Sequence, residues 1–345
     1  MSPPRTYREA GVDVAEAERA VERIGRAAAS TLTPAVLGGV GGFGALFRFD
    51  PTTHPDPVLV SSTDGVGTKL KVAITLGLHD TIGIDLVHAC LNDVLVSGAD
   101  PLFLLDYLAV GDLRADVVEE IVGGVAAACA AAGIPLIGGE TAELPDLVAA
   151  GEYDLAGFVV GVVARADLID GTRVRAGDLL LGIPSSGLHT NGYSLARRVL
   201  PPETWSKPMP DNGRTIGDAL LEPHRSYLDE LRAARRAVRG AGGDIGALAH
   251  ITGGGWDGNV PRTLPEGLGV EVDTGSWPVP AIFSLLQSRG DLADEEMVRT
   301  FNLGIGMTVV VPPAVADAAL GAVPDACRIG RVVEVPEGEP RVRFA

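Results

Sequence analysis

LVSSTDGVGTKLKV, residues 59–72, reads as an apolar strand that ends in Asp64, two close glycines, Thr68 and Lys69. Glycine allows positive φ angles, so successive backbone N–H groups in such a turn can surround an anion. The Lys69 ammonium can approach a phosphate as a point charge, and the Asp64 carboxylate can hold a hard cation. The spacing differs from that of a P-loop, G-x-x-x-x-G-K-[ST]. A plain hairpin turn with a solvated lysine is the alternative, and it explains poorly the acidic residues that follow.

The predicted helix 84–97 carries three polar side chains among apolar neighbours. Asp85 and Asn92 are seven residues apart, close to two helical turns, so they share a face of the helix. Asp93 is rotated by about 100° from Asn92. A carboxylate on such a helix usually faces solvent or caps a terminus, so Asp93 alone is a weak signal.

A loop predicted after strand 134–138 is glycine-rich and acidic, and it contains Gly138, Gly139, Glu140 and Thr141. If the carboxylates of Asp64, Asp93 and Glu140 converge, their repulsion is severe. Two unit charges 4 Å apart interact by about 4 kcal/mol at an effective dielectric constant of about 20. A divalent cation relieves this repulsion, and ligands that are all oxygen favour Mg²⁺ over zinc. We therefore expect a magnesium site formed by these three carboxylates.

Two glycine-rich turns in the second half of the chain are candidate ligand loops. SSGLHTNGY (185–193) follows an apolar strand, and serine and glycine N–H groups in that position can bind an anion. Asn191 can hydrogen-bond a ribose or an amide, and His189 can act as an acid or base or be an ordinary loop histidine. For ITGGGWDGN (251–259), a close helix–strand turn is as good an explanation as a substrate phosphate. The candidate substrate-binding residues are Ser185, Ser186, Gly187, His189, Asn191, Thr252, Gly253 and Gly254.

Composition limits the class of protein. The 345 residues suffice for two domains, and with 46% hydrophobic but 5% aromatic residues the cores must be mainly aliphatic. A net charge of −17 argues against a nucleic-acid partner or an acidic membrane surface. Three widely spaced cysteines indicate a reduced, cytoplasmic protein rather than a disulfide framework or zinc site. Residues 121–139 are uncharged, but Pro135 and the Ala/Gly content favour a packed helix and strand over a membrane span.

Alternating helix and strand patterns predict an α+β or mixed α/β fold with two domains, 1–168 and 169–345, separated by the polar segment 165–177. A glycine cluster at 38–46 formally matches G-x-G-x-x-G, but the pattern after it indicates a strand rather than the helix of a dinucleotide site. We expect a hairpin or flap there. The other predicted elements are helices 11–30, 68–77, 115–132, 193–200 and 225–239, and strands 57–63, 101–109, 153–164 and 304–311. A second strand–helix series begins with residues 179–200.

In these residues the chain resembles the phosphoribosylformylglycinamidine cyclo-ligase family, the aminoimidazole ribonucleotide synthetases of purine biosynthesis. The matching segments run in family order from about residue 41 to 307. They are GGFGAL, STDGVGTKL, DTIGIDLV, PLFLLDY, LIGGETAELP, YDLAGFVVGVV, SSGLHTNGYSL, HITGGG, NVPR and FNLGIGM. The chain departs from the family pattern at Gly25, where a lysine is expected.

The resemblance implies a two-domain α+β fold with a C-terminal α/β-type sandwich. It also implies a homodimer whose N-terminal domains join their strands into a barrel-like sheet. The implied activity is the ATP-dependent cyclisation of formylglycinamidine ribonucleotide, with Mg²⁺. A phosphoryl transferase similar to thiamine-phosphate kinase and a non-catalytic nucleotide-binding relative are the alternatives. The implied catalytic residues are Lys69, Asp93 and His189, and the implied ATP contacts are Asp64, Gly65, Gly67, Thr68, Lys69, Asp93, Gly138, Gly139, Glu140 and Thr141.

Overall fold

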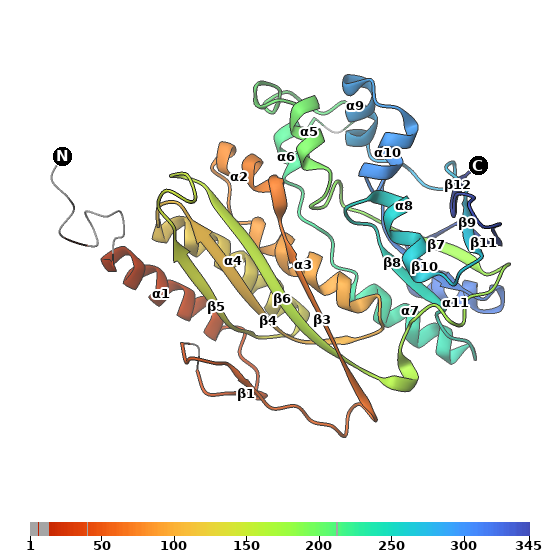
Figure 1. The fold of residues 1–345 in the computed structure, drawn as a ribbon, viewed down its shortest axis with the longest axis horizontal. Coiled ribbons are helices and arrows are strands. Elements are labelled where there is room, and N and C mark those ends of the chain that lie inside the picture. The colour runs from red at the N-terminus through yellow and green to blue at the C-terminus, as the bar shows by residue number, and fades with distance from the viewer. Residues whose placement is uncertain (1–5, 7–13, 40, 212) are drawn as a thin grey trace. The chain divides into compact units, whose positions relative to one another are not determined.

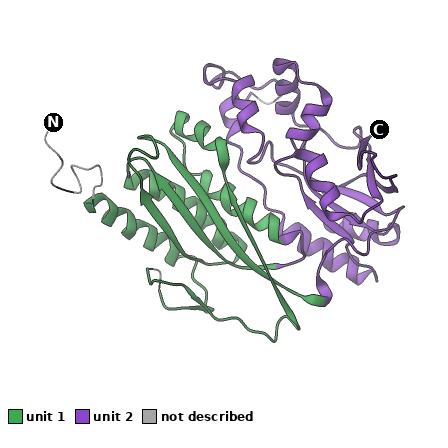
Figure 2. Cartoon of the chain, in the orientation of Figure 1, with its two compact units in different colours: residues 1–94, 100–165 green, residues 95–99, 166–345 purple. Residues whose placement is uncertain are grey.

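The computed structural model describes residues 6, 14–39, 41–211 and 213–345, and Figure 1 shows its helices and strands. Contacts divide the chain into two compact units, coloured separately in Figure 2. Unit 1 comprises residues 1–94 and 100–165, and unit 2 comprises residues 95–99 and 166–345. The division after residue 165 falls at the start of the polar segment 165–177.

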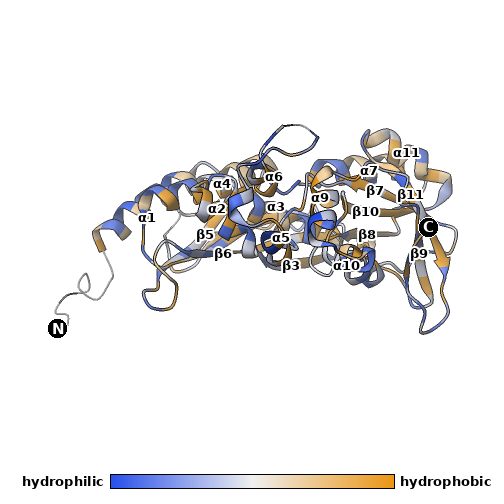
Figure 3. Ribbon diagram, turned by 90° about the horizontal axis from the view of Figure 1, so that it is seen from above, coloured by the Kyte–Doolittle hydropathy of each residue, from blue (hydrophilic) through white to orange (hydrophobic). Residues whose placement is uncertain are grey.

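Unit 1 contains a four-stranded sheet and its helices. Its elements are α1 (Val14–Ala29), β1 (Val36–Leu37), β2 (Leu46–Phe47), β3 (Pro57–Gly65), the 3-10 helix Gly67–Lys69, α2 (Leu70–Leu76), α3 (Ile82–Leu95), β4 (Asp100–Val110), α4 (Ala115–Ala132), β5 (Leu136–Glu143) and β6 (Tyr153–Ala164). Helix α4 and strand β6 have the predicted bounds. Residues 11–13 of the predicted first helix lie outside the described residues. Figure 3 shows hydrophilic and hydrophobic residues alternating around α1, as expected for an amphipathic helix.

The sheet of unit 1 has the strand order β3-β6-β4-β5. Strand β6 is antiparallel to both of its neighbours, and β4 and β5 are parallel. Because side chains alternate between the two sides of a strand, the sheet has two distinct faces. One face packs against helices α3 and α4, and we call it the helix face. On the opposite, open face Leu59, Phe158 and Tyr107 are 66%, 45% and 37% exposed.

The glycine cluster at 38–46 connects the two strands of an antiparallel hairpin, β1 and β2, in which Val36 pairs with Phe47. No helix follows it directly, because β2 leads through a turn into β3. A helix must begin at the last glycine for a dinucleotide-binding loop to work. The hairpin prediction is therefore confirmed.

Unit 2 is built on a six-stranded sheet with the order β12-β9-β11-β7-β10-β8. Its strands are β7 (Leu179–Pro184), β8 (Ala247–His250), β9 (Leu268–Val272), β10 (Ile305–Val311), β11 (Cys327–Glu334) and β12 (Val342–Phe344). Its helices are α5 (Tyr193–Val199), α6 (Ile216–Leu220), α7 (Leu228–Gly240), α8 (Gly255–Asn259), α9 (Ala281–Gly290), α10 (Asp294–Thr300) and α11 (Ala316–Ala322). All strand pairs are antiparallel except β12 with β9. This unit is thus of the α+β kind, and the expected α/β-type arrangement is corrected.

The core of unit 2 is mainly aliphatic, as its composition predicts, and it also contains a pair of stacked tryptophans. Trp256 is fully buried and stacks on Trp277, with ring centroids 5.8 Å apart. The Trp256 indole nitrogen donates to the backbone oxygen of Asn302. This satisfied hydrogen bond lets the large ring lie in the core at no polar cost.

Cys90, Cys129 and Cys327 are free thiols. In the described part of the chain, no helix combines the length and the apolar character needed to cross a bilayer. The apolar stretch after residue 120 continues α4 and then enters the sheet as β5.

Candidate functional site

The turn after β3 is shaped by local contacts that the sequence of the turn explains. The Asp64 carboxylate accepts a hydrogen bond from the Gly65 N–H at 2.8 Å. The Val66 N–H donates to the Leu155 carbonyl oxygen of β6 at 3.3 Å. Gly67 has φ of 67°, a left-handed conformation that glycine adopts without strain. The backbone therefore turns sharply at the end of the edge strand β3 and leads directly into Thr68 and Lys69.

One row of residues crosses the whole sheet of unit 1 at the level of Asp64. Asp64 pairs with Gly157 of β6, Gly157 with Asp106 of β4, and Asp106 with Gly139 of β5. Directly paired residues point to the same face, so the Asp64 and Asp106 carboxylates share the helix face. A side-chain carbon at Gly157 would lie 3.0 Å from Cys90 Sγ, and one at Gly139 would overlap the Asp106 carboxylate. The two glycines thus leave room for the carboxylates and for helix α3.

Helix α3 brings Asp93 to the same region as Asp64. The Ser62 hydroxyl on the helix face of β3 donates to Asp93 Oδ2 at 3.1 Å. Burial, and then the charges of Asp64 and Asp93, raise the pKa of the Cys90 thiol to about 12. Ser62 and Asp64 lie two residues apart on the same face of β3, so Asp93, which accepts from Ser62, lies in the neighbourhood of Asp64. The structure therefore brings Asp64 and Asp93 into one neighbourhood, as predicted from two separate segments.

Lys69 lies in a different environment from the one we expected. Its ammonium is fully buried and lies 2.9 Å from Asp85 Oδ1 and 2.8 Å from Asp85 Oδ2. Asp85 is itself fully buried in the first turn of α3. The pair joins the turn after β3 to the start of this helix. In this structure the charge of Lys69 is compensated by Asp85, and direct contact with a phosphate stays a prediction.

Glu140 is separated from the other two predicted metal ligands. Residues 140–143 belong to strand β5 and not to a loop, because β5 continues in parallel register with β4 as far as Glu143. Glu140 pairs with Tyr107, one residue out of phase with the Asp106–Gly139 pair, so its exposed side chain points to the open face. Among the described residues, Asp64, Asp93 and Glu140 do not form a cluster with metal-ligand spacing. The expected three-carboxylate convergence is corrected to two, Asp64 and Asp93.

The other predicted residues of β5 are divided between the two faces. Gly138 pairs with Leu105 and faces the open side, whereas Thr141 pairs with Leu108 and faces the helices. Gly139 serves the helix face by leaving room for Asp106. The predicted ATP contacts of β5 therefore do not form one surface within this unit.

Asp106 is a charged residue of this region that sequence reasoning missed. Burial raises its pKa to about 7, and burial together with the Asp106 charge raises the pKa of Cys129 on α4. The sequence feature that could have identified Asp106 is a single carboxylate within the apolar strand pattern PLFLLDYLA. An aspartate at an inward-facing strand position is rare enough to mark a special environment.

In unit 2, the SSGLHTN turn is held by a buried asparagine. The Ser185 hydroxyl donates to Asn302 Oδ1 at 3.0 Å, and the Asn302 amide donates to the Gly187 carbonyl oxygen at 2.9 Å. The Ser185 N–H donates to the Gly304 carbonyl oxygen at 2.8 Å. Asn302 thus fixes the shape of the turn.

The second glycine-rich turn lies against the first. A side-chain carbon at Gly253 would lie 3.3 Å from Asn191 Oδ1, so the two predicted substrate loops adjoin. The Asn259 amide donates to the carbonyl oxygens of Gly253 and Gly255 at 3.2 and 2.7 Å. The Thr252 hydroxyl donates to Asn259 Oδ1 at 3.2 Å. Gly254 has φ of 89°, which favours glycine at this position.

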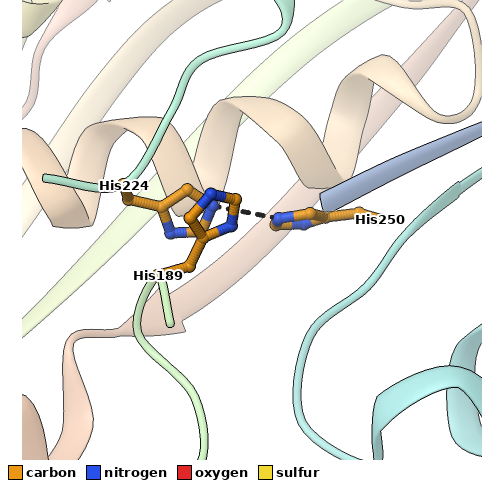
Figure 4. A group of neighbouring side chains, drawn as sticks. All are labelled: His189, His224 and His250. Atoms are coloured by element: carbon orange, nitrogen blue, oxygen red, sulfur yellow. Dashed lines mark hydrogen bonds between the residues drawn. The ribbon is translucent and has the colours of Figure 1, made fainter. Parts of the chain in front are cut away.

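His189 is fully buried between its own turn and two other histidines. Its Nε2 accepts a hydrogen bond from the Ser186 N–H at 3.2 Å, and its φ is 62°. Its ring stacks on that of His224, with centroids 3.9 Å apart. His250 completes the group, with its ring centroid 6.5 Å from that of His189 (Figure 4). Sequence reasoning identified only the first of the three histidines as a candidate.

Two features can do chemistry. In unit 1, two carboxylates beside a glycine turn offer oxygen ligands to a hard cation and N–H groups to a phosphate. In unit 2, two adjoining glycine-rich turns offer backbone and amide hydrogen bonds to a polar ligand, with a buried histidine behind them. Both arrangements suit a phosphorylated substrate.

Comparison with known proteins agrees with this arrangement. The family profile "AIR synthase related protein, N-terminal domain" matches residues 43–163, and the corresponding C-terminal domain matches residues 175–343. A phosphoribosylformylglycinamidine cyclo-ligase of Sorangium cellulosum (strain So ce56) is 53% identical over 348 residues, 98% of this chain and 99% of that protein. One of Desulfitobacterium hafniense (strain Y51) is 52% identical over 312 residues, 90% of this chain and 91% of that protein.

Among solved structures, hydrogenase maturation protein HypE in complex with ATP has a TM-score of 0.65. The match has 21% sequence identity and covers 92% of this chain and 88% of that one. At this identity the likeness concerns the fold alone. The matches to both domain profiles and the identity over nearly the whole length place the chain in the phosphoribosylformylglycinamidine cyclo-ligase family.

Proposed function

We propose that this chain is an ATP-dependent ligase that converts formylglycinamidine ribonucleotide into 5-aminoimidazole ribonucleotide, ADP and phosphate in purine biosynthesis. The observation that carries the proposal is the 53% identity with a cyclo-ligase over 98% of the chain. The identity spans both units, so it includes the regions that we propose below for ATP and for the substrate.

The chemistry of this reaction requires binding and charge stabilisation more than a protein nucleophile. The γ-phosphoryl group of ATP moves to the formyl oxygen of the substrate, and ADP leaves. A substrate nitrogen then attacks the activated carbon and forms the C–N bond of the ring. The oxygen departs with the phosphate, and the nitrogen loses its proton. Because the ring closure is intramolecular, selecting the reactive conformer is the main task of the protein.

The turn after β3 is the part of unit 1 that best fits a nucleotide with Mg²⁺. The Asp64 carboxylate of this turn and the Asp93 carboxylate of helix α3 are hard oxygen ligands of the kind that Mg²⁺ prefers. When bound, the ion neutralises charge on the phosphates of ATP. Ser62 orients the Asp93 carboxylate through its hydrogen bond. We assign ATP contacts to Asp64, Gly65, Gly67, Thr68 and Asp93.

The structure gives less direct support for ATP contacts by Lys69 and by the residues of β5. Because the Lys69 ammonium is buried against Asp85, we assign Lys69 to holding the turn in place. Its contact with a phosphate requires exchange of the Asp85 carboxylate for the phosphate. Glu140 remains a predicted ATP contact, although its side chain lies on the open face, opposite the face of Asp64 and Asp106.

In unit 2 we propose that the two adjoining glycine-rich turns bind the substrate ribonucleotide. Asn191 and Gly253 lie side by side, so a single ligand can contact both turns. His189 accepts from the Ser186 N–H, which fixes its neutral form with a hydrogen on Nδ1. This histidine is our candidate for handling the proton that the attacking nitrogen releases.

We propose a homodimer that forms through the open face of the unit 1 sheet. That face exposes three large apolar side chains, Leu59, Phe158 and Tyr107, which lie on three different strands. Exposed apolar side chains gathered on one face of a sheet commonly mark an interface. Two copies related by a two-fold axis would bury the same residues on both partners.

Turnover with the named substrate tests the function. The full chain, incubated with ATP, Mg²⁺ and formylglycinamidine ribonucleotide, is expected to release ADP and form an imidazole product detectable by diazo coupling. Asp93→Ala should lower kcat by roughly 10²-fold or more, because a ligand of the activating cation is lost. Asp317→Ala, on the exposed surface of α11 in unit 2, is the matched control and should leave kcat unchanged.

Two results would contradict the proposal. ATP binding without substrate-dependent ADP release would indicate a non-catalytic nucleotide-binding protein. ADP release with thiamine phosphate, and none with the ribonucleotide, would indicate a phosphoryl transferase. Near-wild-type turnover of Asp93→Ala would remove Asp93 from the site while leaving the reaction itself intact.

A further inference from the structure

Three histidines of unit 2 form a buried group that the proposed reaction does not fully use (Figure 4). His189 lies in the turn after β7, His224 lies before α7, and His250 is the last residue of β8. They are 0%, 1% and 5% exposed. One nitrogen of each lies within 4.8 Å of the nitrogens of the other two. Within the described residues, no other group of three histidine, cysteine or acidic side chains has this spacing.

His224 and His250 already face each other through the atoms that would bind an ion. Their Nε2 atoms are 3.1 Å apart, the contact drawn as a dashed line in Figure 4. Two neutral imidazoles at this distance share one hydrogen, which one ring donates and the other accepts. Two imidazole nitrogens on a tetrahedral Zn²⁺, each about 2.0–2.1 Å from the metal, lie about 3.3–3.4 Å apart. An ion can therefore replace the shared hydrogen with little movement of the two rings.

The other ring nitrogen of His224 has the kind of partner that metal-bound histidines use. Thr190 Oγ1 lies 3.4 Å from His224 Nδ1. Metal-ligating histidines generally donate their second N–H to an oxygen, which fixes the tautomer and the direction of the ring. A hydrogen on Nδ1 leaves the lone pair of Nε2 directed toward His250.

His189 is placed to become the third ligand after one rearrangement. Its ring plane lies at 20° to that of His224 in a stacked contact. Since imidazole lone pairs lie in the ring plane, His189 must turn out of this stack to reach an ion held by the other two. When the His189 ring rotates in this way, its Nε2 loses the hydrogen bond from the Ser186 N–H and gains a bond to the metal.

We propose that His189, His224 and His250 form a binding site for one divalent transition-metal ion of the Zn²⁺ type. Three imidazoles favour Zn²⁺, Co²⁺, Ni²⁺ or Cu²⁺ over the hard cations Mg²⁺ and Ca²⁺. The site is thus different in chemistry from the carboxylates of unit 1. Three protein ligands leave a fourth position open for water or for a ligand atom. The proposal shares His189 with the proposed reaction, but the metal titration does not depend on turnover, so the two can fail separately.

Metal titration of the full chain tests this site. Wild type, prepared free of metal, is titrated at pH 7.5 with Zn²⁺ in competition with a chromophoric chelator. The variants are His224→Gln and His250→Gln, and the control is His54→Gln, which removes a histidine of unit 1 that lies beside Asp100. We expect one Zn²⁺ per wild-type chain. Each cluster variant should lose more affinity than the roughly 10–100-fold that removal of an outer-sphere partner costs, and the control should match wild type.

Spectroscopy separates this site from chance binding and from a folding defect. Co²⁺ bound to wild type should show the visible absorption of a four-coordinate site, and X-ray absorption of bound Zn²⁺ should show imidazole scattering. Thermal melts without metal show whether a variant is folded, and Zn²⁺ should raise the Tm of wild type and of His54→Gln but not that of the two cluster variants. If both cluster variants unfold, the imidazole count from X-ray absorption decides. Absence of tight binding, equal weakening by His54→Gln, or an oxygen-only ligand shell would overturn the proposal.

Discussion

Asp106 shows how much a single residue can depend on its place in the sheet. It lies on the helix face between Gly157 and Gly139, and burial raises its pKa to about 7. The ordinary value is 3.8, so the folded protein holds this carboxyl as the neutral acid over a wider pH range than the unfolded chain does. As the pH rises from about 4 to about 7, the unfolded chain loses the proton first. The free energy of unfolding therefore falls across this window.

Replacing Asp106 with asparagine should remove this pH dependence. Asparagine has nearly the same shape and no charge, so Asp106→Asn should raise Tm relative to wild type, more at pH 8 than at pH 5. The linkage limit is about 1.4 kcal/mol for each pKa unit, so a gain of several kcal/mol at pH 8 is the upper bound. Differential scanning calorimetry at both pH values measures the effect, with Asp317→Asn as the exposed control. A difference in Tm that is the same at both pH values would contradict the assignment.

At the level of elements, the buried pair Lys69–Asp85 connects the turn after β3 to helix α3. Both side chains are fully buried, and the ammonium lies within 3 Å of both carboxylate oxygens. Removing one partner leaves an uncompensated charge in the interior, which costs about 3–5 kcal/mol. Replacing both with apolar residues of similar size is often neutral or stabilising.

We therefore expect Lys69→Met to lower the free energy of unfolding by about 3–5 kcal/mol and the double variant Lys69→Met/Asp85→Leu to recover most of it. Lys71→Met is the matched control, because Lys71 pairs with Glu152 where both side chains are about 40% exposed. An exposed pair contributes at most about 1 kcal/mol. Urea denaturation of the four proteins measures these values. Equal losses for Lys69→Met and Lys71→Met would show that the buried pair has no special role.

The elements themselves were largely predictable from sequence. Helix α4 and strand β6 occur with the predicted bounds, because their apolar periodicity and their glycine and polar flanks are local signals. Strand β5 was predicted too short. Its second half, GETAE, has the composition of a loop, and it is a strand because β4 offers a parallel partner as far as Val110.

At the level of the whole molecule, the exposed apolar side chains on the open face of the unit 1 sheet are the basis for the proposed homodimer. Phe158 lies in the central strand β6 of this face, and Leu59 lies on the edge strand β3. Phe158→Arg should dissociate the proposed dimer, because a charge would be buried at the interface centre. Size-exclusion chromatography with light scattering measures the mass. Val21→Arg on the exposed side of α1, at a position that is 65% exposed, is the control.

The measured masses show whether the protein is a dimer and whether the dimer forms through the open face. A monomeric wild type would contradict the proposed homodimer. A dimeric Phe158→Arg would show that the dimer uses another surface. Loss of activity together with loss of the dimer would indicate that catalysis depends on the pair.

Local pattern was sufficient to place the glycine turn at 64–69, the acidic helix α3 and the two glycine-rich turns of unit 2. These features depend on neighbours in sequence: periodicity, turn residues and strand ends. Which side chains lie close together is decided by contacts between segments that are far apart in the sequence. Strand register places Glu140 on one face of the unit 1 sheet and Asp106 on the other. Packing places the Lys69 ammonium against the buried Asp85 carboxylate. Three histidines that are far apart in sequence each have a ring nitrogen within 4.8 Å of the other two. A shift of one residue in register reverses the face of every side chain, and that register is set by partner strands distant in the chain.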